Sequence, residues 1–436
     1  MHDTAPVIRS AKTEAALSIA DECVHFGFCV SVCPTYVLTR DEDESPRGRI
    51  DLIQAMLSSD AAPPPDTVRH VDQCLSCLSC MSTCAARVDY AHLIDEARAH
   101  IEDNYKRPWP DRFMRRLVAA VIPHPRRLRF ALALAKLGRP VAGLLGSRIR
   151  GMAALATQRT SSNTATSANA GIYPAHGTRR MRVALLPGCA QQVLAPHINA
   201  ATIRVLTRHQ CEVIVPTSRC CGALAGHMGR MAEGSSAAAE TLDIMLAIHR
   251  TAPLDAIVVT ASGCGTTMKD YAHLFAHDAQ RLASAREVAA LTKDITEVLA
   301  ELELPEQPRN AIRVAYHDAC SLQHGQQVRT PPRAVLQRVG FELVPVPEAH
   351  FCCGSAGTYN LLQPETASQL GARKAAHIDS TAADVACAGN LGCLTQLDGY
   401  LNTPIVHTVE LVDWATGGPR PASWPTQHLR NGPLAQ

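Results

Sequence analysis

The sequence predicts an α/β protein in which a helical, cysteine-rich N-terminal module precedes two copies of a parallel-sheet α/β module. The 17 cysteines fall into two zones, seven from Cys23 to Cys84 and ten from Cys189 to Cys393. Beyond Met181 the cysteine pattern repeats, and short β-branched runs alternate with helix-like stretches. With 436 residues, 46% of them hydrophobic, the chain is long enough for several domains with their own cores.

Composition excludes several classes of function. The formal net charge is +2 and aromatic residues make up 4%, which argues against a nucleic-acid binder. The first 22 residues have no apolar core of signal-peptide length, and no later stretch has the length and apolarity of a spanning helix. We therefore expect a cytoplasmic location, where many cysteines indicate metal binding rather than disulfides.

Four composition changes suggest domain boundaries. Residues 112–150 contain ten Lys or Arg and no Asp or Glu, with apolar runs between the charges. This amphipathic, helix-like stretch is expected to dock on an acidic surface, either anionic lipid or a protein partner, or to be a solvated helix face. The boundaries predict a ferredoxin-like domain (1–105), a basic helical segment (106–150), a flexible linker (151–180) and two cysteine-rich domains (181–305 and 306–420).

Two cysteine runs near the N-terminus follow the bacterial two-cluster ferredoxin pattern. Gaps of two, two and three residues separate the cysteines from Cys74 to Cys84, and the fourth cysteine of such a run ligates the other cluster. The upstream run ends in Cys33-Pro34 but has Phe26 at its second ligand position. The wiring predicts a complete 4Fe-4S cluster held by Cys74, Cys77, Cys80 and Cys33.

The remaining N-terminal cysteines, Cys23, Cys29 and Cys84, supply one thiolate fewer than a 4Fe-4S cluster needs. A 3Fe-4S cluster needs only three and is the preferred assignment. An incomplete 4Fe-4S cluster with a water-ligated iron, His25 as a substitute ligand, and an empty site are the alternatives. The apolar ring of Phe26 is expected to exclude water from this corner.

The second cysteine zone is a duplication, in which both copies contain a Cys-Cys-Gly triplet between two further cysteines. The offsets between matching cysteines are 131, 132 and 129 residues. Each copy reads strand, helix, strand, helix, strand, which predicts a parallel sheet with its site beyond the carboxyl ends of the strands. We expect the four cysteines of each copy to converge there: Cys189, Cys220, Cys221 and Cys264 in the first, and Cys320, Cys352, Cys353 and Cys393 in the second.

Four soft thiolates per copy suit iron–sulfur clusters or zinc and not magnesium or calcium. Thiols that are redox-active or structural without a metal are the alternative. Cys211 and Cys387 lie in predicted strands and are expected to be buried apolar residues. His317 and His324 flank Cys320, but we expect them to be hydrogen-bonded polar residues and assign them no role.

These motifs resemble the iron–sulfur subunit of bacterial glycolate oxidase, also called glycolate dehydrogenase. The resemblance implies an electron-transfer subunit beside flavin-containing partner subunits, which carry FAD and oxidise glycolate to glyoxylate. It also implies electron delivery towards the quinone pool, with peripheral attachment to the inner membrane as an alternative to a purely cytoplasmic location. The segments that carry it are CVHFGFCVSVCPTY, SPRGRI, CLSCLSCMSTC, LLPGC, RCCGA, TASGCG, SLQHGQ and PVPEAHFCCGSAGTYNLLQPE.

The same motifs occur in proteins of related function. The CCG triplets are similar to those of heterodisulfide reductases, but Ala261 and Asn390 stand where a CxxC pair would need cysteine, and Ala85 replaces the usual proline after Cys84. The iron–sulfur subunit of a D-lactate or glycerol-3-phosphate dehydrogenase and a zinc-stabilised scaffold are further alternatives. The sequence has no Gly-rich nucleotide fingerprint, so we expect flavin on another chain and no catalytic residue in this one.

Overall fold

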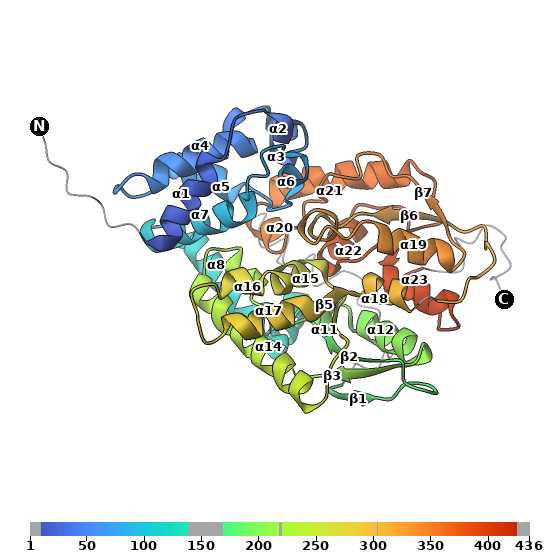
Figure 1. The fold of residues 1–436 in the computed structure, drawn as a ribbon. Helices are drawn as coiled ribbons and strands as arrows, with labels where there is room; N and C mark the ends of the chain where they lie inside the picture. Colours follow the sequence, from blue (N-terminus) through green and yellow to red (C-terminus); the bar gives the residue numbers. More distant parts are fainter. Residues whose placement is uncertain (1–9, 138–168, 218–219, 303, 425–436) are drawn as a thin grey trace, which may run out of the picture.

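The computed structural model describes residues 10–137, 169–217, 220–302 and 304–424. In Figure 1, a helical N-terminal module lies above and beside two sheet-containing modules that follow one another along the chain. The α/β class, the helical N-terminal module and the duplicated parallel sheets are as the sequence predicts.

The N-terminal module is built from short helices around an apolar core. Its buried residues include Ile53, Leu93 and Ile94, each with no exposed surface. The longer helices start at clear capping signals: Ser45 accepts a hydrogen bond from the Gly48 amide at the start of α4. The helices are α1 (Ala11–Asp21), α2 (Phe28–Ser31), α3 (Pro34–Thr39), α4 (Pro46–Leu57), α5 (Pro65–Asp72), α6 (Ser79–Thr83) and α7 (Tyr90–Asn104), with a 3₁₀ turn η1 (Glu42–Glu44).

Two further helices, α8 (Trp109–Val121) and α9 (Pro125–Leu137), form most of the described part of the basic segment. Residues 138–150 lie outside the described residues. The segment's charges are not all available for docking, because Arg115 is buried and pairs with Asp72 at 2.9 Å. Arg115 also pairs with Asp111 at 3.1 Å, one residue before the stretch that has no acidic residue. The pairing with Asp72 could not be predicted from local charge, because the two residues are about forty positions apart.

The first sheet has the order β1-β3-β2-β4-β5. All its pairings are parallel except that of β1 with β3, which is antiparallel. β1 (Gly171–Tyr173) lies in the expected 151–180 linker, so the end of that segment belongs to the sheet. The other strands are β2 (Met181–Leu186), β3 (Cys211–Val215), β4 (Ala256–Val259) and β5 (Thr292–Asp294); the helices are α11 (Gln191–Leu194), α12 (Pro196–Arg208), α13 (Ala223–Gly226), α14 (Met231–Thr251), α15 (Ser262–Lys269), α16 (Tyr271–Leu274), α17 (Leu282–Leu291) and α18 (Ile295–Glu301).

The second sheet has the order β7-β6-β8-β9 and is parallel throughout. In both sheets the strand that opens the repeat lies between the next two, and one more parallel strand than predicted extends the edge. The strands are β6 (Arg313–His317), β7 (Glu342–Val344), β8 (Val385–Ala388) and β9 (Ile405–His407); the helices are α19 (Thr330–Arg338), α20 (Tyr359–Leu362), α21 (Pro364–Asp379), α22 (Leu391–Asp398) and α23 (Thr408–Ala415), with a π-helical turn η3 (Ser321–Gly325).

The two sheet modules share a continuous apolar core. Buried side chains of β2 and β4 belong to the same cluster as those of β6 and β8. α12 packs on α23, where Arg204 Nη2 lies 2.6 Å from a carboxylate oxygen of Asp413. The carbonyl oxygen of Thr260, just after β4 of the first module, accepts a hydrogen bond from His407 of the second at 2.8 Å. This packing fixes the positions of the two cysteine sites relative to one another.

Candidate metal centres

The first centre, site A, comprises Cys33, Cys74, Cys77 and Cys80. All four are buried and line one cavity between α3, α4, α6 and the start of α7. The loop between the helices bends at Ser76 and Leu78, both with left-handed backbone (φ 47° and 60°). The structure therefore brings together the four residues that the ferredoxin wiring groups; that they hold a cluster remains a prediction.

Polar groups surround the sulfur atoms of site A. The Ser76 amide and the Tyr90 hydroxyl donate to Cys74 Sγ at 3.4 and 3.7 Å, and Arg49 Nη1 donates to Cys33 Sγ at 3.9 Å. Burial raises the pKa of Cys80 well above its usual range. Release of the thiol proton therefore needs a compensating positive charge, such as a bound metal, and buried Arg49 supplies part of it.

The second centre, site B, comprises Cys23, Cys29 and Cys84. They line one cavity together with Phe26, and burial followed by the negative charge of Cys23 raises the pKa of Cys29 to about 11. Phe26 lines this cavity, but its side chain is itself 63% exposed; that it excludes water from the corner remains a prediction. The residues on either side, His25 and Gly27, both have left-handed backbone (φ 54° and 81°), in the loop that presents this ring to solvent.

His25 lines the same cavity, so it stays an alternative ligand. Its Nε2 lies 3.6 Å from a carboxylate oxygen of Asp51, and about half of its side chain is exposed. Site B offers the three thiols that the sequence predicts.

The first cysteine-rich module gathers four thiols beyond its strands. Cys189 follows β2, and the vicinal pair lies in the loop before α13. Cys264, expected at a strand end, lies instead in the first turn of α15. Cys189, Cys220 and Cys221 belong to one buried cluster, against which Cys264 packs, and hydrogen bonding with the Cys189 and Cys221 thiols lowers the pKa of Cys220. The four converge as the topology predicts.

The second module repeats the arrangement. Cys320 Sγ lies 3.7 Å from Cys352 Sγ, and Cys353 is hydrogen-bonded to Cys393. The glycine after the pair is required here, since Gly354 has φ +86° and an added Cβ would lie 2.6 Å from the backbone oxygen of Ala367. Metal binding by either set of four cysteines remains a prediction.

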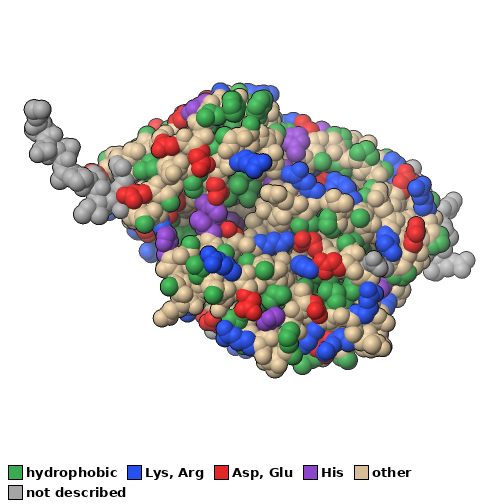
Figure 2. Space-filling model, in the orientation of Figure 1, with side chains coloured by type: hydrophobic (Ala, Val, Ile, Leu, Met, Phe, Trp, Pro, Cys, Tyr) green, Lys and Arg blue, Asp and Glu red, His purple; other side chains and the backbone are tan. Residues whose placement is uncertain are grey.

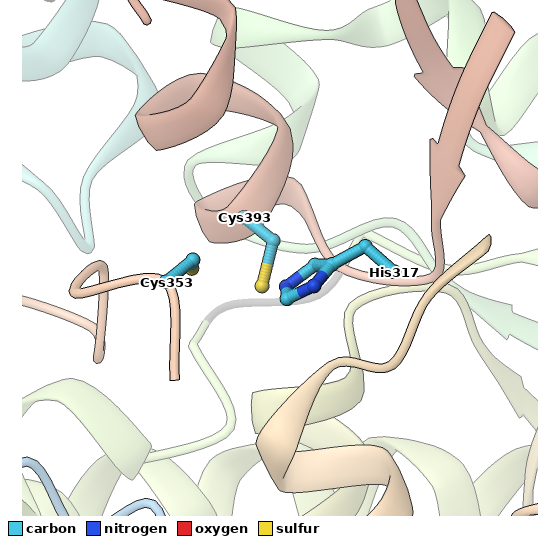
Figure 3. A group of neighbouring side chains, drawn as sticks. All are labelled: His317, Cys353 and Cys393. Carbon is cyan, nitrogen blue, oxygen red and sulfur yellow. The ribbon is translucent and has the colours of Figure 1, made fainter. Parts of the chain in front are cut away.

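The structure adds one residue that the sequence analysis left unassigned. His317 ends β6 and points towards Cys353 and Cys393 (Figure 3); one donor atom from each of the three lies within 4.8 Å of the others. The side chain is 2% exposed, and neither ring nitrogen has a hydrogen-bond partner. Burial, then the charge of Lys374, lowers its pKa to about 3, so the ring is neutral at pH 7. The expectation of a hydrogen-bonded polar residue is wrong.

Comparing the two copies could have identified His317, because the residue at the matching position of the first copy is the apolar Leu186. The expectation for His324 is confirmed: its Nδ1 lies 2.7 Å from the Ser82 hydroxyl. Cys211 and Cys387 are confirmed as fully buried core residues of β3 and β8.

Site A lies against the second cysteine-rich module. Cys77 shares a buried cluster with Cys352, and Cys320 packs at its edge. Burial, then the neighbouring charge of Cys320, raises the pKa of Cys77 well above its usual range. The thiols of the N-terminal module and those of the second copy are therefore close enough to interact electrostatically.

Comparison with known proteins agrees with this organisation. The family model for the 4Fe-4S dicluster domain matches residues 22–88, and the model for the cysteine-rich CCG domain matches residues 183–269 and 314–398. The chain is 36% identical over 411 residues to the glycolate oxidase iron–sulfur subunit of Escherichia coli K12, covering 93% of this chain and 97% of that one. The chain belongs to the glycolate oxidase iron–sulfur subunit family.

Other matches are more distant. A probable glycolate oxidase iron–sulfur subunit of Bacillus subtilis is 30% identical over 392 residues, covering 86% of this chain and 87% of the relative. Lactate utilization protein A of Geobacillus kaustophilus is 29% identical over 242 residues, covering 53% of this chain and 99% of the relative. A crystal structure of a hypothetical Helicobacter pylori protein shares the fold (TM-score 0.55, 10% identity, 96% of this chain and 75% of that one). Among the described helices, none is long and apolar enough to cross a membrane.

Proposed function

We propose that this chain is the electron-transfer subunit of a complex that oxidises glycolate to glyoxylate, with FAD on flavin-containing partner subunits and the quinone pool as electron acceptor. The observation that carries the proposal is the gathering of four buried cysteines at site A within a chain of this family. Glycolate is favoured over lactate as the substrate, because the glycolate oxidase relatives match along most of the chain and the lactate utilization relatives along about half.

Site A is proposed to hold a 4Fe-4S cluster, since its four buried thiols fit that donor set. An iron–sulfur cluster supplies one-electron uptake and release when bound. The protein's part is to exclude water and to set the electrostatics around the sulfurs. Arg49, Tyr90 and the Ser76 amide do this by donating towards Cys33 and Cys74.

Site B is proposed to hold a 3Fe-4S cluster, on the count of its three thiols. A 4Fe-4S cluster with a water-ligated iron is the alternative that an experiment must exclude. Exposed Val24, Phe26 and Phe28 form an apolar rim beside the site, 57%, 63% and 61% exposed. We propose this rim as the contact for the flavin-containing subunit, because it lies directly over a redox site.

Each CCG module is proposed to hold a metal centre, iron–sulfur or zinc, and the predicted domain boundaries are retained as proposals. The experiment that tests the assembly is anaerobic co-purification of the chain with the products of neighbouring genes, followed by iron, sulfide and flavin analysis. Flavin on a partner, and iron and sulfide on this chain, are expected. Zinc without iron would instead support the scaffold alternative.

The helix pair α8–α9 is proposed to attach the otherwise cytoplasmic complex to the anionic surface of the inner membrane. Large apolar side chains are exposed on both helices: Trp109 (69%), Phe113 (53%), Phe130 (66%) and Leu134 (51%). Five exposed arginines accompany them, at positions 112, 116, 126, 127 and 129. Aromatic rings beside arginines are typical of helices that lie in the headgroup region of anionic membranes.

Vesicle flotation tests this attachment. The chain is expected to float with vesicles containing anionic lipid, to float less at high salt, and to stay unbound with zwitterionic vesicles. Replacing Trp109 and Phe113 by serine should reduce flotation, whereas the same change at exposed Tyr400, on another module, should not. Salt-insensitive binding, or binding to the flavin-containing subunit alone, would contradict the lipid proposal.

A further inference from the structure

His317 is a buried donor without a partner inside a cluster of thiols. It is the last residue of β6 and pairs in register with Ala388 of the neighbouring strand β8. Its ring reaches the space between the CCG loop and the start of α22 (Figure 3). Both ring nitrogens are buried and lack a hydrogen-bond partner. A buried imidazole in this state loses its hydrogen bonds to water without replacement, so the site favours a bound species that accepts the nitrogen lone pair.

The spacing of the donors indicates the type of ligand. The Cys353 and Cys393 sulfurs and a His317 nitrogen all lie within 4.8 Å of one another. Ligands of a single zinc ion, bound at about 2.0 to 2.3 Å, lie about 3.5 to 4 Å apart, so a small inward shift would complete such a site. In a 4Fe-4S cluster each cysteine binds a different iron and the thiolates stand further apart. Among the described residues, this trio is the one group of three such donors with so short a spacing.

The donor types agree with the spacing. Two thiolates and a neutral imidazole suit a borderline-soft ion such as Zn²⁺. Cys352, adjacent to Cys353 in the chain, lies outside this trio, and its Sγ is 3.7 Å from Cys320 Sγ. The Asn390 side-chain amide donates to Cys393 Sγ at 3.4 Å, the kind of outer contact that orients a ligating sulfur.

We infer that the second CCG module binds one zinc ion through His317, Cys353 and Cys393. The first module lacks this nitrogen donor, because Leu186 stands at the matching position. The inference rests on the proposed metal-binding role of the CCG cysteines, but it is independent of the flavin partner and of glycolate. Zinc has no redox chemistry, so this ion would fix the end of β6 against the CCG loop and the start of α22 rather than carry electrons.

The test is zinc and iron analysis of the anaerobically purified full chain, with the variant His317→Leu, which reproduces the residue of the first module. The wild-type chain should contain about one zinc ion, with one nitrogen at about 2.0 Å and sulfurs at about 2.3 Å in zinc-edge X-ray absorption. His317→Leu should lose most of the zinc and keep its iron and sulfide. The matched control His324→Leu, which removes a hydrogen-bonded histidine nearby, should keep both metals.

Three results would overturn the inference: full iron loading without zinc, an all-sulfur zinc shell in the wild-type chain, and zinc retained in His317→Leu. The absorption measurement needs no variant, so it decides the question even where His317→Leu does not fold. A chain that contains the zinc site but accepts no electrons from its partner would support the inference and contradict the proposed function.

Discussion

Arg49 offers a direct test of how the protein sets the electrostatics of site A. Its side chain is 1% exposed and pairs with the buried carboxylate of Glu44. It also donates to the His70 carbonyl oxygen at 2.6 Å and to Cys33 Sγ at 3.9 Å. Replacing Arg49 by methionine keeps most of the volume but removes the positive charge beside the thiolates, so a cluster at site A should become harder to reduce.

The size of the effect follows from the 3.9 Å between Arg49 Nη1 and Cys33 Sγ. A charge and an electron at that separation attract by about 1 kcal/mol in water and about 4 kcal/mol at an effective dielectric constant of ~20, which corresponds to a fall in potential of roughly 40 to 170 mV. The variant also removes the buried cation of Glu44, which keeps only His70 at 2.8 Å and Arg69 at 4.0 Å, and this should cost up to about 3 to 5 kcal/mol of folding free energy.

Redox titration followed by electron paramagnetic resonance measures the potential. Glu44→Gln should raise it, and the double variant should lie between the two single variants, because the removed charges are opposite. Arg107→Met is the matched control, since buried Arg107 pairs with Asp72 rather than with a thiol; it should destabilise the fold with little change in potential. An unchanged or raised potential in Arg49→Met would refute the reasoning.

Three further predictions concern the other sites. Phe26→Cys supplies the fourth thiol of site B and should convert its oxidised 3Fe-4S resonance signal into that of a second 4Fe-4S cluster; a wild-type chain with full iron and no 3Fe-4S signal would contradict this. Replacing both Cys352 and Cys353 by serine should lower the metal content of the chain and the activity of the complex. The control Cys387→Ser should leave the metal content unchanged, because that thiol is buried in β8 away from the sites. Equal metal content in the wild-type chain and both variants would exclude a metal site at the cysteine pair. Burial lowers the pKa of His92, but hydrogen bonds to two carboxylates outweigh this effect and raise the pKa to about 10. The stability that His92 adds relative to His92→Gln should therefore be complete below about pH 6.5 and disappear as the pH rises through 10. A difference in thermal midpoint between the two chains that grows with pH would contradict this prediction.

Local patterns in the sequence were sufficient for much of the fold. The spacing from Cys74 to Cys84 predicted which thiols gather at site A, and β-branched runs after Met181 predicted the parallel strands. The duplication then predicted that the cysteines of each copy gather beyond the strands, because parallel strands bring their carboxyl ends to one edge, although Cys264 and Cys393 lie in the helices that follow β4 and β8. The edge strands β5 and β9 were not predicted, since three residues each are too short to show a period.

The failures involve contacts between distant residues. The ion pair of Arg115 with Asp72 joins two helices, and the missing hydrogen bonds of His317 depend on what surrounds it in the folded chain. Periodicity and spacing describe residues that are close in sequence, so they could not predict contacts between residues that are distant in sequence.

Electron transfer through this chain is tested most directly by adding glycolate to the anaerobic complex of the chain with its flavin-containing subunits and recording electron paramagnetic resonance spectra. We predict that glycolate reduces iron–sulfur clusters on this chain, so that the signal of oxidised 3Fe-4S disappears and that of reduced 4Fe-4S develops. The chain without its partners should not respond. Glyoxylate formation by a complex whose clusters on this chain stay oxidised, or whose chain contains no iron, would contradict the account.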